Sequence, residues 1–163
     1  MRRGARVALL GLEEGELART VAALPEGGAH GWAVDVSDAA AMEETAARVQ
    51  SRFGSPSVVI GNAGIAAAGP FLDLDPRVWR RVVEVNVVGS AVTARAFLPD
   101  LLRTRGYYLQ VSSLAALVPA PLMSAYCASK AGAESFAQVL RTEVAHRGVG
   151  GEAAVDGRAD GAR

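Results

Sequence analysis

Short apolar runs alternate along the chain with longer stretches in which apolar and polar residues are mixed at helical spacing. The runs are rich in Val, Ile, Leu and Tyr, and polar or glycine residues follow them closely, a pattern typical of strands buried on both faces. Strands are predicted at 6–10, 31–36, 57–60 and 107–113, and helices at 11–24, 39–53, 77–98 and 124–147. This alternation predicts right-handed βαβ units and a mainly parallel sheet covered on both faces.

Capping residues define the ends of two predicted helices. Ser37 or Asp38 can accept a backbone hydrogen bond at the start of the second helix, and Gly54 is suited to end it. Asp75 followed by Pro76 is a cap and first-turn signal for the long helical stretch that comes next.

Composition limits the partners and the compartment. The chain has 163 residues, half of them apolar, which is enough for one domain with a core. Its 17 basic and 17 acidic residues cancel, so no global field favours nucleic acid or an anionic membrane. Arg80 and Arg81 are predicted to lie on a solvated helix face.

No stretch approaches the roughly 20 apolar residues of a membrane span. Cys127 is the single cysteine, and the two histidines lie far apart, so no metal site is predicted. We expect a soluble, cytoplasmic protein that acts on a small molecule.

The last sixteen residues differ in composition from the rest. The segment at 148–163, GVGGEAAVDGRADGAR, has no apolar run long enough for a strand and is rich in Gly, Ala, Asp and Arg. It is predicted to be a disordered tail. One domain is therefore expected over residues 1–147.

Polar residues gather just after the predicted strands, at the carboxyl edge where open parallel sheets bind their ligands. Asp35 and Val36 close the second strand, the segment Asn-Ala-Gly at 62–64 follows the third, and Ser113 ends the fourth. A carboxylate, an amide, glycine backbone and a hydroxyl are thus predicted to meet at one edge.

Tyr126 and Lys130 lie four residues apart and so share one face of the last predicted helix. A lysine ammonium near a phenol stabilises the phenolate, which makes Tyr126 a candidate general acid or base. With a serine hydroxyl to hold an oxygen atom, these groups suit proton transfer coupled to hydride transfer at a carbonyl carbon, the hydride coming from a cofactor. Taken alone, such a pair also arises by chance, with a tyrosine that only packs.

Four motifs together resemble the short-chain dehydrogenase/reductase family: NAG at 62–64, NVVG at 86–89, VSS ending at Ser113 and YCASK at 126–130. They occur in the family's order and spacing, and the resemblance covers about residues 4–149. It implies a Rossmann-like, doubly wound α/β fold and an oxidoreductase that uses NAD or NADP to interconvert a secondary alcohol and a ketone.

The same resemblance implies roles for individual residues. Tyr126 is the implied acid/base, Lys130 activates it and binds the nicotinamide ribose, and Ser113 orients the substrate oxygen. Asn86 is implied to fix its helix and to take part in a proton relay. Asp35 and Val36 match the family's adenine contact. The full implied cofactor-binding set is Asp35, Val36, Asn62, Ala63, Gly64, Tyr126 and Lys130.

Parts of the family pattern are absent from the sequence. The segment GLEEGEL at 11–17 offers Gly11 and Gly15 for a phosphate-binding turn, but its three glutamates would repel a diphosphate, and it aligns better with the family's second strand. The N-terminus is therefore expected to be truncated, without the first strand–helix unit and its glycine-rich turn, and the last strands to be missing. Gly11 then stands where an acidic residue would select NAD, so the choice between NAD and NADP stays open.

The absent strand would be central, between those predicted at 6–10 and 57–60. These two strands are expected to pair with each other, to depend on another chain, or to leave a poorly folded sheet. The apolar loop at 114–123 suits a hydrophobic alcohol or ketone. The family commonly pairs helices such as those around 78–103 and 125–147, which predicts a homodimer or homotetramer. The rival hypothesis is an inactive remnant that serves as an oligomerisation or interaction module, or has no function.

Overall fold

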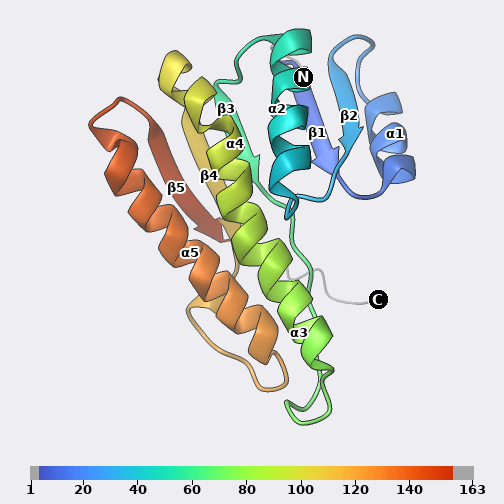
Figure 1. Cartoon of the computed structure of the whole chain (residues 1–163), viewed down its shortest axis with the longest axis vertical. Coiled ribbons are helices and arrows are strands. Elements are labelled where there is room, and N and C mark those ends of the chain that lie inside the picture. The colour runs from blue at the N-terminus through green and yellow to red at the C-terminus, as the bar shows by residue number, and fades with distance from the viewer. Residues whose placement is uncertain (1–3, 156–163) are drawn as a thin grey trace.

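The computed structural model describes residues 4–155, in which strands and helices alternate as the apolar pattern predicts (Figure 1). The strands are β1 (Val7–Gly11), β2 (Ala29–Ala33), β3 (Val58–Gly61), β4 (Tyr107–Ser112) and β5 (Gly150–Val155). The helices are α1 (Glu14–Ala22), α2 (Ala39–Phe53), α3 (Pro76–Val83), the π-helical segment η1 (Glu84–Val88), α4 (Gly89–Thr104), the 3-10 turn η2 (Leu114–Ala116) and α5 (Ser124–Ala145).

The five strands form two separate parallel sheets. β1 pairs with β2, and β4 lies between β3 and β5; all three pairings are parallel. This confirms the predicted α/β class with parallel strands and an incomplete sheet. Within residues 4–155 no ladder joins β1 to β3, so the expected direct pairing of these two strands is wrong for this structure.

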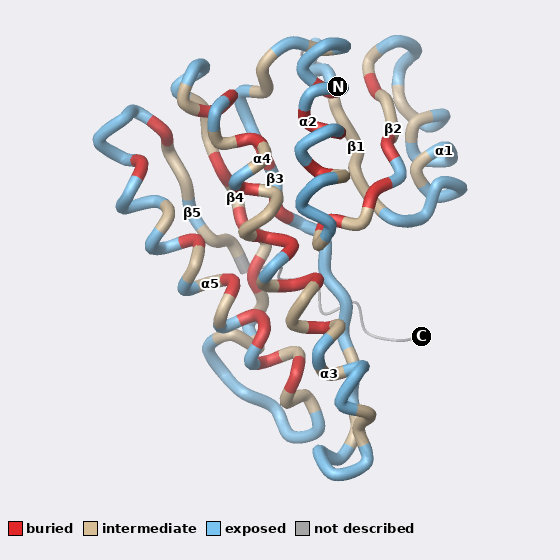
Figure 2. Tube along the Cα trace, viewed as in Figure 1, coloured by how far each residue is buried: buried red, intermediate tan, exposed pale blue. Residues whose placement is uncertain are grey.

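Helices α2, α4 and α5 lie on one face of the sheets, and α1 packs beside β1 and β2 (Figure 1). The buried residues lie mainly where these helices meet the strands (Figure 2). Their largest members include Trp32, Met42, Phe97, Leu101 and Tyr108. Because this apolar burial fixes each helix against the strands, it holds the loops at the carboxyl ends of the strands in place.

Two predicted helix caps are present. The Asp38 carboxylate accepts a hydrogen bond of 3.0 Å from the Ala41 N–H, and Gly54 ends α2 with a φ of 79°. The Asp75 carboxylate accepts a hydrogen bond of 2.8 Å from the Arg77 N–H, with Pro76 in the first turn. These contacts confirm that the helix starts are encoded locally.

Helices α3 and α4 are continuous through η1, and together they form the longest helix of the described residues. Pro76–Thr104 is also long and apolar enough to cross a membrane by length and composition, although 39% of its apolar window is buried against the rest of the protein. The expectation that no stretch approaches a membrane span is therefore too strict for this helix. It packs against α2, α5 and β3, as a core helix does.

Residues 150–155 form a strand, so the prediction that the chain is disordered from 148 onwards is wrong for these residues. β5 pairs with the edge of β4, with Gly150 opposite Tyr107 and Gly151 opposite Tyr108. A Cβ at Gly150 would lie 2.7 Å from the Tyr107 ring, so a small residue is needed there. The neighbouring strand supplies the hydrogen-bond partners that the weak local β propensity does not predict. Residues 156–163 of the predicted tail lie outside the described residues.

Gly61 should tolerate no side chain, because a Cβ there would lie 2.6 Å from Gln110 Oε1 and 2.7 Å from the Tyr108 hydroxyl. Both groups belong to a buried network in which the Gln110 amide donates to the Gly61 carbonyl at 2.8 Å. We expect Gly61→Ala to lower the free energy of unfolding by about 1–3 kcal/mol in urea titrations. Gly15→Ala is the control, since nothing lies within 4 Å of its added Cβ and alanine favours helix. Equal effects of both changes would contradict the prediction.

Candidate active site

The predicted site residues other than Asp35 and Val36 lie on four segments near the carboxyl ends of β3 and β4. Asn62, Ala63 and Gly64 form the loop after β3, and Asn86 lies in the middle of η1. Ser113 follows β4, and Tyr126 and Lys130 lie in the first two turns of α5. The loop after β3 and the start of α5 come close together, since a Cβ added at Gly64 would lie 3.6 Å from Lys130 Nζ.

The Asn86 side chain connects the loop after β3 to α5. Its Oδ1 accepts a hydrogen bond of 2.8 Å from the Ile65 N–H, and its Nδ2 donates to the Ile65 carbonyl and to Ser129 Oγ, both at 2.9 Å. Asn86 is 2% exposed, and these three bonds use both of its N–H donors and one of the two acceptor positions of Oδ1. It therefore acts as a buried clamp, held by a π-helical turn of the kind often found at functional sites.

Lys130 extends from α5 to the end of β4. Its ammonium donates a hydrogen bond of 3.1 Å to the Val111 carbonyl, and the residue is 6% exposed. A Cβ added at Gly64 would lie 3.2 Å from Asn86 Oδ1 and 3.6 Å from Lys130 Nζ. The glycine backbone, the amide and the ammonium therefore meet at one point of the site, where an added Cβ would be in tight contact with Asn86.

Tyr126 and Ser113 flank this point. Lys130 Nζ lies 5.8 Å from the centre of the Tyr126 ring, and the ring is partly exposed. Ser113 Oγ accepts a hydrogen bond of 3.2 Å from the Ala115 N–H, which caps η2, a turn that packs against α5. Ser112, by contrast, is buried, with its hydroxyl directed into the protein. Of the two serines, Ser113 is therefore the one available to a ligand.

Asp35 is held by a network that includes Arg81, which corrects the prediction that Arg81 lies on a solvated helix face. The Asp35 carboxylate accepts hydrogen bonds from the Ser37 N–H at 2.9 Å, the Ser37 hydroxyl at 2.6 Å and the Arg81 guanidinium. Arg81 also donates to Ser37 Oγ at 2.8 Å and lies 3.9 Å from the Glu84 carboxylate. Sequence reasoning missed this residue because Asp35 and Arg81 are 46 positions apart.

Hydrogen bonds from Ser37, with a further contribution from Arg81, lower the pKa of Asp35 below its usual value of 3.8, while burial opposes them. A carboxyl whose pKa is lowered by folding adds stability above about pH 4, and this stability is lost as the pH falls through its folded pKa. We therefore expect Asp35→Asn to lower the melting temperature at about pH 7, with a smaller loss at about pH 3. Thermal unfolding at both pH values measures this, with the exposed Asp73→Asn as control. An equal loss at both pH values would contradict it.

Val36 does not stand free beside Asp35 but packs against η1 and α4. Val36 is 8% exposed, and a Cβ added at Gly89 would lie 2.7 Å from its Cγ2. Gly89 of the NVVG motif therefore allows the helix to approach the end of β2. The side chain of Val36 is a packing group, which leaves its backbone as the part that could contact a ligand.

A cavity of about 1240 Å³ lies between the two sheets. The residues that are expected to bind the cofactor but not to take part in catalysis all line this cavity: Asp35, Val36, Asn62, Ala63 and Gly64. Arg81 lines it as well. The backbone left open by Gly64 and the carboxylate of Asp35 fit the ribose and adenine ends of a dinucleotide. The start of α1 does not fit its diphosphate, because Glu13 precedes the helix and Glu14 and Glu16 lie in its first turn.

The parallel α/β fold and the edge cluster of Gly64, Asn86 and Lys130 define a member of one family. The family model described as short chain dehydrogenase matches residues 1–157. The chain belongs to the short-chain dehydrogenase family.

Three relatives place the chain within this family. Probable oxidoreductase EphD of Mycobacterium bovis is 40% identical over 153 residues, which make up 91% of this chain and 26% of that protein. The alcohol dehydrogenase of Thermococcus sibiricus, solved with 5-hydroxy-NADP, is 27% identical, with a TM-score of 0.86 over 93% of this chain and 65% of the other. A short-chain dehydrogenase/reductase of Burkholderia phymatum, solved with NAD, is 29% identical, with a TM-score of 0.85 over 92% and 55%. This chain spans less than two thirds of each relative.

Proposed function

We propose that the protein is an NAD- or NADP-dependent oxidoreductase that interconverts a secondary alcohol and a ketone. The observation that carries this proposal is the meeting of Lys130 Nζ, Asn86 Oδ1 and the Gly64 backbone, with Tyr126 one turn earlier on the same helix. A buried ammonium beside a phenol and a glycine backbone suits a group that exchanges a proton next to a bound nicotinamide. The archaeal relative solved with 5-hydroxy-NADP is itself named an alcohol dehydrogenase.

In this mechanism the nicotinamide cofactor supplies or accepts the hydride, and the protein handles the proton. In the reducing direction the Tyr126 hydroxyl donates its proton to the carbonyl oxygen, and in the oxidising direction the phenolate removes the proton of the alcohol. Lys130 provides the positive charge that favours the phenolate. Ser113 orients the substrate oxygen through its hydroxyl. Asn86 holds the loop after β3 against α5, so that these groups keep their places.

The residues that would hold the cofactor are those that open to the cavity between the sheets. Asp35 and the backbone of Val36 would contact the adenosine end, and the segment 62–64 would pass beside the ribose and the nicotinamide. Tyr126 and Lys130 would complete the nicotinamide ribose site. Gly11, which also lines the cavity, offers no acidic side chain to exclude a 2′-phosphate, so the proposal includes both NAD and NADP.

The substrate is proposed to be apolar around its reacting carbon. Large hydrophobic side chains stand exposed in the loop after Ser113, among them Leu114, Leu117 and Val118 at 60%, 67% and 61% exposure. The Leu122 carbonyl accepts a hydrogen bond of 2.8 Å from the Gly69 N–H, which ties this loop to the one after β3. Exposed apolar surface of this kind beside a site commonly meets an apolar ligand.

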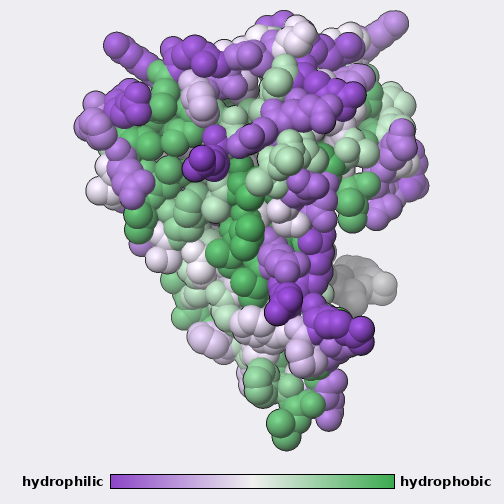
Figure 3. Space-filling view, in the orientation of Figure 1, coloured by the Kyte–Doolittle hydropathy of each residue, from purple (hydrophilic) through white to green (hydrophobic). Residues whose placement is uncertain are grey.

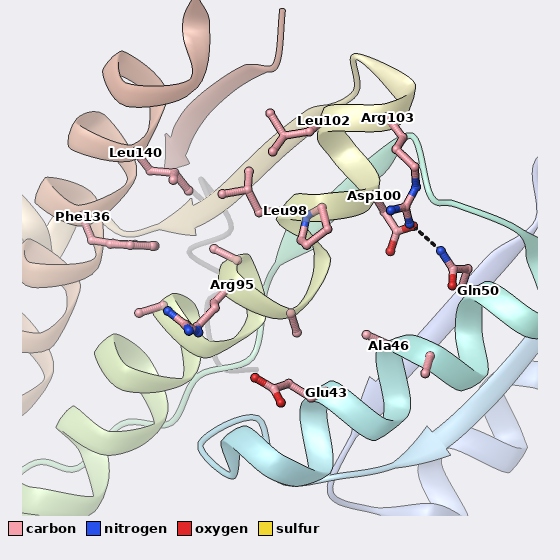
Figure 4. Close-up of a pocket in the computed structure, with 15 residues that line it drawn as sticks. Glu43, Ala46, Gln50, Arg95, Leu98, Asp100, Leu102, Arg103, Phe136 and Leu140 are labelled. Atoms are coloured by element: carbon pink, nitrogen blue, oxygen red, sulfur yellow. Dashed lines mark hydrogen bonds and ion pairs between the residues drawn. The ribbon is translucent and has the colours of Figure 1, made fainter. Parts of the chain in front are cut away.

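We also propose that two copies pair through the face formed by α4 and α5. A groove of about 660 Å³ runs between these helices and α2, and Figure 4 shows Leu98, Leu102, Phe136 and Leu140 directed into it. Hydrophobic residues also follow α4 and α5 on the molecular surface (Figure 3). Light scattering should give at least twice the chain mass of 16.8 kDa, and a monomer at all concentrations would contradict this.

The reducing cytoplasm is the proposed compartment, because Cys127 is free and buried.

The cofactor proposal is tested by titrating the purified chain with NADH and, separately, with NADPH while following nucleotide fluorescence. We expect saturable binding of at least one nucleotide, weakened by Gly64→Val, whose side chain would enter the space beside Asn86 and Lys130. Circular dichroism of that variant checks that it is folded. If neither nucleotide binds at millimolar concentration, this chain is no oxidoreductase, and a role in interaction becomes the better hypothesis.

A further inference from the structure

Two polar side chains of β4 lie inside the apolar core, below the candidate site. Gln110 is 1% exposed, and Tyr108, which belongs to the main apolar cluster, is 3% exposed. A buried amide costs free energy unless its donors and its acceptor find partners. The partners of the Gln110 amide therefore indicate what keeps a polar side chain in this position.

Each polar atom of the Gln110 side chain is hydrogen-bonded. Oε1 accepts a hydrogen bond of 2.8 Å from the Tyr108 hydroxyl, which itself lies 3.2 Å from the Ser90 carbonyl of α4. Nε2 donates to the Gly61 carbonyl at 2.8 Å and, in a longer bond of 3.3 Å, to the Val111 carbonyl. Because the tyrosine hydroxyl donates, it faces the oxygen end of the amide, and the nitrogen end faces the two carbonyls.

The two carbonyls belong to the two segments that form the site. Gly61 is the last residue of β3, directly before the loop at 62–64. The Val111 carbonyl is also the acceptor of the Lys130 ammonium, at 3.1 Å. Gln110 and Lys130 therefore share one acceptor atom, and the same amide holds the start of the loop at 62–64.

The end of the ladder between β3 and β4 explains why the Val111 carbonyl is open to side chains. The Tyr107 N–H donates to the Ser57 carbonyl at 2.9 Å, and alternate residues of a parallel strand direct their backbone groups to opposite neighbours. Val111 therefore faces the β3 side, but the register of these strands ends with Gly61 opposite Gln110. A carbonyl oxygen can accept two hydrogen bonds, and here two side chains supply them in place of a strand.

Gly61 leaves the space that this network occupies. A Cβ at that position would lie 2.6 Å from Gln110 Oε1 and 2.7 Å from the Tyr108 hydroxyl. The glycine and the amide therefore fit each other, at a point between the loop at 62–64 and the acceptor of Lys130. A buried network in which every member is hydrogen-bonded fixes one arrangement of the groups that it joins.

We propose that Gln110 is a positioning residue of the active site. Its amide, oriented by Tyr108, holds the Gly61 and Val111 carbonyls at a fixed separation and so keeps the loop at 62–64 and the Lys130 ammonium in place. Gln110 lies behind the residues that line the cofactor cavity and acts through them. Its effect on turnover rests on the proposed oxidoreductase function, whereas its effect on Lys130 does not.

Gln110→Met tests this role, because methionine has about the same length and carries no N–H or C=O group in its side chain. Tyr108→Phe is the milder variant, which removes the hydroxyl that orients the amide and keeps the amide itself. Leu101→Ala is the control. Leu101 is 0% exposed in α4 and lines neither the groove nor the cavity described above, so this change should lower stability without altering the site. Circular dichroism and urea titration identify conditions in which each variant is folded.

The first measurement follows Lys130 directly. Lys130 is the single lysine of the 163 residues, so lysine labelled with ¹³C at Cε gives one side-chain NMR signal. In Gln110→Met this signal should move by more than its line width, because the carbonyl that accepts from Lys130 has lost its second donor. Tyr108→Phe should move it in the same direction by less, and Leu101→Ala should leave it in place. This measurement needs neither nucleotide nor turnover.

The second measurement is the effect on nucleotide use. In Gln110→Met the KM for the nucleotide should rise by about tenfold, the effect of about one lost hydrogen bond, and kcat should fall by a similar factor. Leu101→Ala should keep both constants within about twofold where it is folded. A residue that only filled space would lower stability and leave KM and kcat near the parent values.

Two results would overturn the proposal: a Lys130 signal that does not move in folded Gln110→Met, or one that moves equally in Leu101→Ala. Kinetic constants of Gln110→Met that match those of Leu101→Ala would overturn its role in turnover. If Gln110→Met does not fold, an unmoved signal in Tyr108→Phe has the same meaning. If the parent chain binds no nucleotide, the oxidoreductase proposal fails, and the Lys130 signal still decides whether Gln110 positions this ammonium.

Discussion

Replacing Tyr126 by phenylalanine should lower kcat for a secondary alcohol by about 10²–10⁴-fold, the usual contribution of a positioned acid or base. The change removes one oxygen atom from a partly exposed ring beside Lys130. The Lys130 hydrogen bond to the Val111 carbonyl does not involve that oxygen, so α5 should stay in place. Nucleotide affinity should therefore fall by no more than about tenfold, the effect of one lost hydrogen bond at the ribose, while turnover falls much further. Steady-state kinetics and nucleotide titration on the same preparation measure the two effects.

Tyr107→Phe is the matched control for this experiment. Tyr107 is the first residue of β4, at the end of the strand opposite to Ser113, and Gly150 of β5 packs against its ring, so it has no part in the proposed proton transfer. It should keep kcat within about twofold of the parent protein. Turnover above about a tenth of the parent value in Tyr126→Phe would contradict the acid/base role.

Replacing Asn86 by alanine should both destabilise the protein and disable the site. The change removes three hydrogen bonds and leaves the Ile65 N–H and C=O without their partner. Each of these three hydrogen bonds contributes about 0.5–1.5 kcal/mol, and the Asn86 side chain that makes them is buried. We expect the free energy of unfolding to fall by about 2–4 kcal/mol, measured by urea titration. Turnover should also fall at urea concentrations below the midpoint of unfolding, where the variant is still folded. The reason is that the loop that carries Gly64 is no longer held against α5.

Asn62→Ala provides the comparison for stability. Asn62 is exposed and lies in the same loop, so the same substitution there should change the free energy of unfolding by no more than about 0.5 kcal/mol. Similar losses from both variants would show that the Asn86 clamp is not what stabilises this loop.

The local signals of the sequence were sufficient for most of the helices and strands. Asp38 and Gly54 define α2 because a side-chain cap and a positive φ act within a few residues of themselves. The alternation of apolar runs with helical stretches was sufficient for the parallel α/β class. The four family motifs were sufficient to identify the family, which the family model and the relatives confirm.

Contacts between distant segments could not be read in the same way. Arg81 has the spacing of an exposed helix residue, and only the packing of α3 beside the end of β2 brings it to Asp35. Nothing in the sequence around Gly61 indicates that a glycine is needed there, since the space beside it is filled by the side chain of Gln110, 49 residues later. β5 has little β propensity of its own and forms because the edge of β4 is there to pair with it.

By itself, then, the sequence determined most of the elements that form, the family they belong to, and which residues are candidates for proton transfer. These features depend on caps, periodicity and short motifs, which act over a few residues. The tertiary structure decided that Asn86, Gly64 and Lys130 meet, that Asp35 is held by Arg81, and that Gln110 and Lys130 share the Val111 carbonyl. Those features depend on hydrogen bonds and packing between segments tens of residues apart, and their partners exist only once the chain has folded.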